Sequence, residues 1–377
     1  MSEKPVRFGI LGCANIARKF ARAILLAPNA TIQAVGSRSA EKAARFAAEN
    51  GFPSTAKMYG NYEAVLDDPD VDAVYVPLPT SLHVKWALLV AEKKKHLLLE
   101  KPVALSTPEF DQILATCEAN GVQFMDGTMW MHHPRTLKMR EFLSDPNGFG
   151  KLKTIHVTFC RDVGPDILQN NIRVKPHLDA LGALSNVGRY CIRAILWAVD
   201  YRLPTTATAL REPEIDQNGA ILSCSATFSW GNGTAATFYC SFLLTAFLLF
   251  FLSFLLFLSF YFHIIWGWTP HFLANFTMDI TCLGNKGSLC VHDFVIPCEE
   301  DTASFYVSSR SRFKELAVGC ELAPEEQTEF ARLVASIRDG SSELEKKWAV
   351  ISRKMQLVLD AIKASVDRGF EPVEVVK

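Results

Sequence analysis

The sequence predicts an α/β protein with two domains: a doubly wound N-terminal domain and a C-terminal α+β domain whose sheet is mainly antiparallel. From Val6 to Asp126, short apolar runs alternate with stretches of helical spacing, which is typical of a parallel sheet with helices on both faces. After Gly150 the apolar runs become longer and alternate with polar residues. We therefore expect a first domain over residues 1–127 and a second over residues 128–377.

The elements of the first domain follow from apolar periodicity and from glycines at expected helix ends, Gly51 and Gly121. The expected strands are Val6–Leu11, Thr31–Gly36, Ala73–Val76, His96–Leu99 and Gln123–Met125. The expected helices are Ile16–Leu26, Ala40–Asn50, Leu82–Glu92 and Pro108–Asn120.

The second domain is expected to combine strands with three helices. Alternation predicts strands at Leu152–Phe159, Ala220–Phe228 and Ala235–Phe242. Helical spacing predicts helices at Leu184–Val199, Pro324–Asp339 and Leu344–Asp367. Ser341 or Ser342 is expected to cap the last helix.

Composition excludes several classes of function. Of 377 residues, 49% are apolar, which is enough for two buried cores. The 39 lysines and arginines almost balance 40 acidic residues, so we expect no nucleic-acid partner and a small-molecule ligand instead. The ten cysteines form no C-x-x-C pair and we expect no metal site. Reduced thiols and an N-terminus without an apolar leader predict a cytoplasmic protein.

One segment does not fit this scheme. Residues 242–268 contain no charged side chain, and residues 242–272 hold nine of the 26 phenylalanines. By length and polarity the segment is typical of a membrane span. It nevertheless interrupts a pair of expected strands, and both halves of one sheet cannot lie on opposite sides of a bilayer.

Removing residues 244–273 joins Leu243 directly to Ala274 and leaves an uninterrupted strand-turn-strand sequence. We therefore favour a retained intron as the origin of the segment, because pyrimidine-rich codons translate into Phe, Leu, Ser and Tyr. Two alternatives stay open: a true membrane anchor, which would make the protein membrane-associated, and a natural apolar insertion that packs on the sheet or on a partner.

A glycine-containing turn follows the first strand and begins the first helix, where the phosphates of a dinucleotide bind free backbone N–H groups. Gly12, Ala14 and Ala17 occupy the positions of the G-x-G-x-x-G/A pattern, so a methyl group replaces the second glycine. The turn predicts a Rossmann-type cofactor site. The expected contacts in this turn are Gly9, Gly12, Cys13, Ala14, Asn15 and Ile16.

The end of the second strand indicates which dinucleotide binds. An NAD site usually has an acidic residue there, to accept a hydrogen bond from the ribose 2′-hydroxyl. This chain has Ser37 and Arg38 instead, and a guanidinium suits a 2′-phosphate. We therefore expect NADP(H) rather than NAD(H).

The strand ending at Leu99 is followed by Glu100-Lys101-Pro102, and here the chain resembles the Gfo/Idh/MocA oxidoreductases, whose signature is this tripeptide. The resemblance covers nearly the whole chain outside the apolar segment, and it includes residues 77–83, 125–130 and 182–190. It is strongest with the dimeric dihydrodiol dehydrogenases and their plant relatives. It implies a Rossmann domain, an α+β second domain and a homodimer.

The resemblance also implies the roles of individual residues. Lys101 would point at the substrate oxygen and the nicotinamide ribose, and Tyr190 would donate a proton during reduction and accept one during oxidation. Asn186 stands one helical turn before Tyr190, among the expected catalytic residues. Further cofactor contacts are expected at Leu78, Thr80, His83 and Glu100, and substrate contacts at Trp130, Arg173 and His177.

Two positions depart from the family. Asn186 stands where relatives commonly carry Asp, and Arg189 where plant relatives tend to carry an aromatic residue. The resemblance implies hydride transfer between NADP(H) and a sugar, cyclitol or diol-like alcohol or carbonyl. Because of the departures, two alternatives remain: a dinucleotide-binding protein with reduced or lost activity, and a misassembled gene product.

Overall fold

The structure of the chain is a computed structural model that describes residues 4–179, 181–243, 276–297, 302–309, 312–319 and 325–376. The retained-intron and apolar-insertion hypotheses concern residues 244–273, which lie outside these ranges, as do all but residues 242 and 243 of the segment 242–268 to which the membrane-anchor hypothesis applies. Among the helices that the ranges contain, none is both long and apolar enough to cross a membrane.

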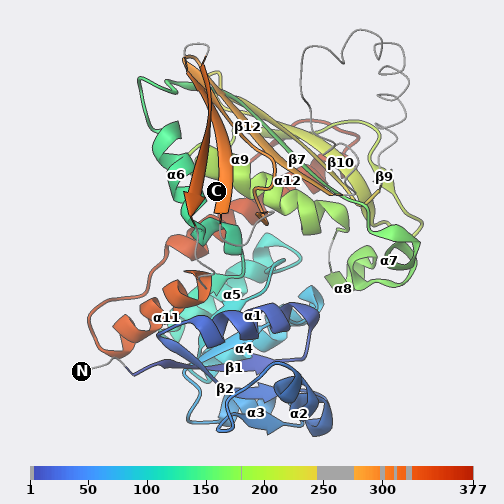
Figure 1. Cartoon of the computed structure of the whole chain (residues 1–377). Coiled ribbons are helices and arrows are strands. Elements are labelled where there is room, and N and C mark those ends of the chain that lie inside the picture. Colours follow the sequence, from blue (N-terminus) through green and yellow to red (C-terminus); the bar gives the residue numbers. More distant parts are fainter. Residues whose placement is uncertain are drawn as a thin grey trace.

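The first domain is built on a six-stranded parallel sheet (Figure 1). Its strands are β1 (Val6–Leu11), β2 (Ala30–Gly36), β3 (Lys57–Tyr59), β4 (Ala73–Val76), β5 (His96–Leu99) and β6 (Phe124–Asp126). They lie in the order β3-β2-β1-β4-β5-β6, which confirms the doubly wound prediction. The order reverses between β1 and β4, so the carboxyl ends of these two strands form the crevice in which such folds bind ligands.

The helices of this domain cover both faces of the sheet. They are α1 (Asn15–Leu26), α2 (Ala40–Glu49), α3 (Glu63–Asp67), η1 (Thr80–Leu82), α4 (His83–Glu92) and α5 (Thr107–Ala119). Each predicted helix is confirmed within one residue at either end. The short elements β3 and α3 were not predicted, because three and five residues are too few to show a period.

The second domain contains a ten-stranded sheet. Its strands are β7 (Leu152–Arg161), β8 (Thr206–Ala209), β9 (Glu214–Ile215), β10 (Ile221–Ser229), β11 (Ala235–Ser241), β12 (Phe276–Gly284), β13 (Gly287–Val291), β14 (Thr302–Ser309), β15 (Arg312–Gly319) and β16 (Val373–Glu374). All neighbouring pairs are antiparallel except β7 with β11.

The two strands on either side of the apolar segment are not partners of each other, which corrects the predicted strand-turn-strand unit. β7 lies between them, and pairs with β11 on one side and with β12 on the other. The end of β11 at Ser241 lies beside Cys160, and the start of β12 at Phe276 lies beside Arg161. The end of β11 and the start of β12 therefore lie at the same end of the sheet, with β7 between them.

Helices of the second domain lie between its sheet and the first domain (Figure 1). They are η2 (Met129–His132), α6 (Pro134–Leu143), α7 (Gly164–Asn170), η3 (Ile172–Val174), α8 (Pro176–Asp179), η4 (Leu184–Gly188), α9 (Arg189–Ala198), α11 (Glu325–Arg338) and α12 (Lys347–Asp367). The prediction of one continuous α-helix from Leu184 is wrong for its first five residues, because η4 is a π-helical turn and the α-helix begins at Arg189. At Gly188 a Cβ would lie 2.9 Å from the Cys240 sulfur, so only glycine fits against β11 there.

The C-terminal helices return to the first domain. Phe330 of α11 packs against Phe8 of β1 with ring centroids 6.0 Å apart, and both side chains are fully buried. The predicted serine cap of the last helix is wrong. Ser341 and Ser342 bond Ser336 at the end of α11, and α12 begins after Lys346 without a side-chain cap. We propose that the first domain ends at residue 127, just after the last strand of its sheet.

Candidate active site

The turn after β1 has the geometry of a phosphate-binding loop. Gly12 has φ +107°, which requires glycine, and a Cβ there would also crowd the Leu78 side chain at 3.2 Å. Ala14, the residue before α1, has an extended backbone and no side-chain cap. The first N–H groups of α1 are therefore left for an anion.

The residues predicted to bind a 2′-phosphate, Ser37 and Arg38, lie at the end of β2. Ser37 is buried, and Arg38 is exposed beside it. Lys42 on α2 adds a second cation near Cys13. Burial raises the pKa of the Cys13 thiol, and the Lys42 charge opposes this shift. The sequence analysis missed Lys42, because a lysine in the first turn of a helix is ordinary and only the fold brings it to this loop.

Glu100 is held rigidly at the end of β5. One carboxylate oxygen accepts a hydrogen bond from the Tyr75 hydroxyl at 2.6 Å, and the other accepts from the Lys101 backbone N–H at 3.0 Å. Burial raises the pKa of the carboxyl group, although Lys101 and Tyr75 oppose this shift. Glu100 therefore fixes the turn that presents Lys101, which is joined to Pro102 by a cis peptide bond.

Lys101 and Tyr190 meet at the junction of the two domains. The Lys101 ammonium lies 4.9 Å from the centroid of the Tyr190 ring. Burial lowers the pKa of Lys101 to about 8 against the opposing effect of Glu100. Burial also raises the pKa of Tyr190, so its hydroxyl remains protonated at neutral pH. The pair combines a phenol that holds a proton with a cation that can stabilise its loss.

Thr80 and His83 both brace the loop after β4. The Thr80 hydroxyl donates to Asp179 on α8 at 2.6 Å, which ties the two domains together. The two ring nitrogens of His83 lie 3.2 Å from the Val103 carbonyl oxygen and 2.8 Å from the Leu78 carbonyl oxygen. His83 is fully buried, so its position supports a structural role rather than the predicted cofactor contact.

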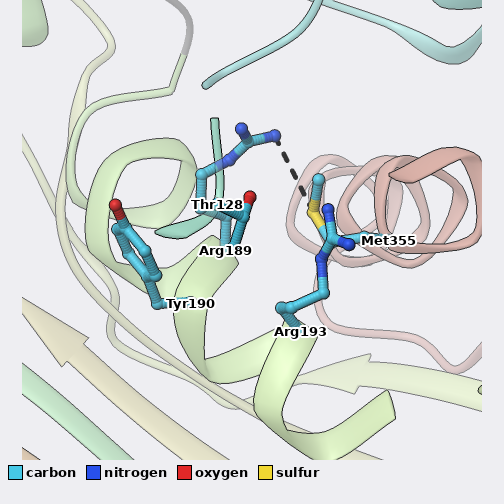
Figure 2. A pocket seen from close by; sticks show the side chains of 5 residues that line it. All are labelled: Thr128, Arg189, Tyr190, Arg193 and Met355. Atoms are coloured by element: carbon cyan, nitrogen blue, oxygen red, sulfur yellow. Dashed lines mark hydrogen bonds between the residues drawn. The ribbon is translucent and has the colours of Figure 1, made fainter. Parts of the chain in front are cut away.

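A small cavity lies beside Tyr190 (Figure 2). Its empty volume is about 180 Å³, including the part that is open to solvent. Figure 2 shows that Arg189 and Arg193, one turn apart on α9, both extend toward the Met355 side of the cavity. The lining residues are Thr128, Arg189, Tyr190, Arg193 and Met355.

The two arginines have different partners. Arg193 donates to Asp126 at 2.7 Å and to the Ser352 hydroxyl at 3.0 Å. Burial alone would raise the pKa of Asp126, but Arg193, Ser352 and Thr128 together lower it. Among the described residues, the hydrogen-bond contact of the Arg189 side chain is with the Met355 sulfur, at 3.8 Å. The Asp126–Arg193 pair was not predicted, since its members lie far apart in the chain.

The remaining predicted site residues differ in burial and in their surroundings. Trp130 lies in the core of the second domain, against Trp197 and Phe294, and its substrate contact stays a prediction. His177 is exposed on α8, whereas Asn186 is buried in η4, 7% exposed. Arg173 is half-buried, within electrostatic range of Lys101.

Comparisons with known proteins agree with this architecture. Residues 6–128 match the oxidoreductase family with an NAD-binding Rossmann fold, and residues 136–248 match the GFO/IDH/MocA C-terminal domain. A 3-ketoreductase from Actinomadura kijaniata, solved with NADP and TDP-benzene, superimposes with a TM-score of 0.76 at 21% identity. That alignment covers 96% of this chain and 98% of the other, and at this identity it shows the fold alone.

Two curated relatives are similar in sequence. A D-xylose 1-dehydrogenase (NADP(+)) from Haloferax volcanii is 34% identical over 55% of this chain and 62% of its own length. A trans-1,2-dihydrobenzene-1,2-diol dehydrogenase from Danio rerio is 30% identical over 53% of this chain and 58% of its own length. The chain thus aligns with about three fifths of each relative. With both domains matched, this chain belongs to the Gfo/Idh/MocA oxidoreductase family.

Proposed function

We propose that the protein transfers a hydride between NADP(H) and the carbinol or carbonyl carbon of a sugar, cyclitol or diol-like substrate. The observation that carries this proposal is the Lys101 ammonium, 4.9 Å from the ring of the buried Tyr190 at the domain junction. Both relatives described above are dehydrogenases of such substrates, which supports the same reaction class.

The residues of the first domain fit the cofactor. Gly12 allows the tight turn after β1 through its positive φ, and the uncapped start of α1 offers N–H donors to a pyrophosphate. After β2, Arg38 and Lys42 supply positive charge for the 2′-phosphate of the cofactor. When bound, NADP(H) supplies the hydride-transfer chemistry of its nicotinamide ring.

The chain's own residues would handle the proton. In reduction, the Tyr190 hydroxyl gives its proton to the substrate oxygen as the carbon receives the hydride. The Lys101 ammonium polarises the carbonyl beforehand and stabilises the phenolate afterwards. In oxidation the same phenolate takes the proton back from the alcohol. Glu100 keeps Lys101 in place through its bond to the Lys101 backbone N–H.

The test is a kinetic comparison of the wild type with Tyr190→Phe. NADPH oxidation is measured with aldehydes and ketones of sugars, cyclitols and diols, and NADPH binding by fluorescence. We expect turnover by the wild type and a loss of roughly 10²–10⁴-fold in Tyr190→Phe, with unchanged NADPH affinity. Tight NADPH binding without turnover of any substrate would favour the alternative, a binding protein, which the uncharged Asn186 suggests.

Two further properties belong to this proposal. We place the protein in the cytoplasm, because all eight cysteines among the described residues are free thiols and most are buried. We also propose a homodimer, as the family resemblance implies. Light scattering on the purified full chain would return the mass of two chains, and a mass of 42.0 kDa would contradict the dimer.

A further inference from the structure

Arg189 is a buried cation to which no carboxylate of the described residues makes a hydrogen bond, although Asp126 and Asp179 act on it at longer range. The residue is 3% exposed, and its Nε atom has no hydrogen-bond partner. Its Nη2 atom faces the Met355 sulfur at 3.8 Å, and a thioether is a weak acceptor. A buried guanidinium normally pairs with a carboxylate, because the loss of its hydration is costly when no opposite charge replaces the water.

The acidic groups nearby are already engaged. Asp126 binds Arg193, Ser352 and Thr128, which occupy both of its carboxylate oxygens. Asp179 accepts the Thr80 hydroxyl. Neither carboxylate makes a hydrogen bond with Arg189.

Other cations lie close to the same place. Lys101 lies within electrostatic range of two arginines, Arg173 and Arg189. The Nε atom of Arg173 is buried and unpartnered as well. Arg173 and Arg189 therefore both act electrostatically on Lys101, and each has a buried guanidinium nitrogen without a hydrogen-bond partner.

We propose that Arg189 binds a carboxylate of the substrate, so that the preferred substrate is a polyhydroxy carboxylic acid rather than a neutral sugar. This inference rests on the proposed function, since it assigns a substrate to the Tyr190 site. The phosphates of NADP(H) do not compete for Arg189, because their expected donors are the start of α1 and Arg38. Arg189 lies in the wall of the small cavity beside Tyr190, and a guanidinium donates two parallel hydrogen bonds to a planar carboxylate.

The kinetic test uses matched pairs of acid and neutral substrate. D-glucuronate is paired with D-glucose, and D-gluconate with D-glucitol, each oxidised with NADP⁺. We expect the wild type to prefer the acid of at least one pair. In Arg189→Met the ratio of kcat/KM for acid to neutral substrate falls roughly 10- to 100-fold, the size expected for charge-assisted hydrogen bonds. Arg189→Lys retains part of the preference, and a ratio unchanged in Arg189→Met overturns the proposal.

A stability measurement separates a binding role from a structural one. Without substrate, Arg189→Met is expected to raise the thermal midpoint, because an uncompensated buried charge is removed. Arg193→Met is the matched control on the same helix, and it is expected to lower the midpoint because it leaves Asp126 unpaired. A fall of similar size in both variants would show that Arg189 is structural and would overturn the proposal.

Calorimetric titration of D-glucuronate and D-gluconate into the NADP⁺-saturated protein tests the site without turnover. Binding that is lost in Arg189→Met supports the carboxylate site even if no substrate is oxidised, in which case only the proposed reaction fails. Turnover of neutral sugars with no Arg189-dependent binding of either acid overturns the carboxylate site and leaves the proposed reaction standing.

Discussion

Asp126 and Arg193 form a buried ion pair, 2.7 Å long, in which both side chains are 2% exposed. Asp126 ends the last strand of the first sheet, and Arg193 lies on α9 of the second domain. Ser352 of α12 donates to the second Asp126 oxygen at 2.6 Å. Three segments from distant parts of the chain are therefore tied together next to Tyr190, and the pair fixes the position of α9 relative to Lys101.

Arg193→Met should lower the free energy of unfolding by about 3–5 kcal/mol, because Asp126 would remain buried without its cation. Urea unfolding followed by circular dichroism measures this change. Arg353→Met is the control, because Arg353 forms a partly exposed pair with Asp111, whose loss should cost about 1 kcal/mol or less. Equal losses in both variants would contradict the role of the buried pair.

Lys101 should control the pH dependence of reduction. Its pKa of about 8 means that the ammonium is present below this pH and is lost above it. We therefore expect kcat/KM for carbonyl reduction to fall as the pH rises through about 8. Lys101→Met should be slower by roughly 10²–10⁴-fold and should lack this pH step. A step that persists in Lys101→Met would assign it to another group.

Arg38 should determine the preference for NADPH. Arg38→Gln is expected to weaken NADPH binding by roughly 10- to 100-fold and to leave NADH binding unchanged, since only NADPH carries the 2′-phosphate. Fluorescence titration measures both affinities. Arg45→Gln, an exposed arginine on α2, makes the same change in charge and serves as the control. Equal loss of NADPH affinity in the two variants would show that the net charge of this region, and not a contact from Arg38, determines the preference.

Asn186→Asp should redirect the substrate preference. Asn186 lies three residues before Arg189, so a carboxylate there can pair with the buried guanidinium. We expect kcat/KM to rise for neutral diols and to fall for sugar acids, and the thermal midpoint to increase. A rise for both substrate types would indicate instead that Asn186 had impaired Tyr190 directly.

Deletion of residues 244–273 should preserve the fold. The ends of β11 and β12 are separated by one intervening strand, or about 10 Å, and residues 242, 243, 274 and 275 are enough to span it. Circular dichroism and gel filtration of the shortened protein should show a folded, monodisperse species that binds NADPH. Aggregation of the shortened protein alone would contradict this expectation. Separately, transcripts that all retain codons 244–273 would exclude the intron hypothesis.

Much of the first domain could be predicted from the sequence, because local patterns determine its elements. Mostly apolar strands of four to seven residues and helices with a buried stripe, such as Phe20 and Ile24 on α1, leave a clear period. The positions of Gly12 and Lys101 also follow from local order, since a parallel sheet brings the carboxyl ends of its strands to one edge. The sequence therefore determined the domain type, the cofactor loop and the lysine.

Only the tertiary structure decided which distant groups meet. Nothing near Arg189 in the sequence shows that Asp126 pairs with Arg193 instead, or that His83 bonds two backbone carbonyl groups. The same holds for Trp130, which packs into a core, and for β7, which separates β11 from β12. Local propensity depends on neighbours in the chain, whereas burial and partnership depend on packing between segments far apart in it. That packing left Arg189 without a hydrogen-bonded carboxylate among the described residues.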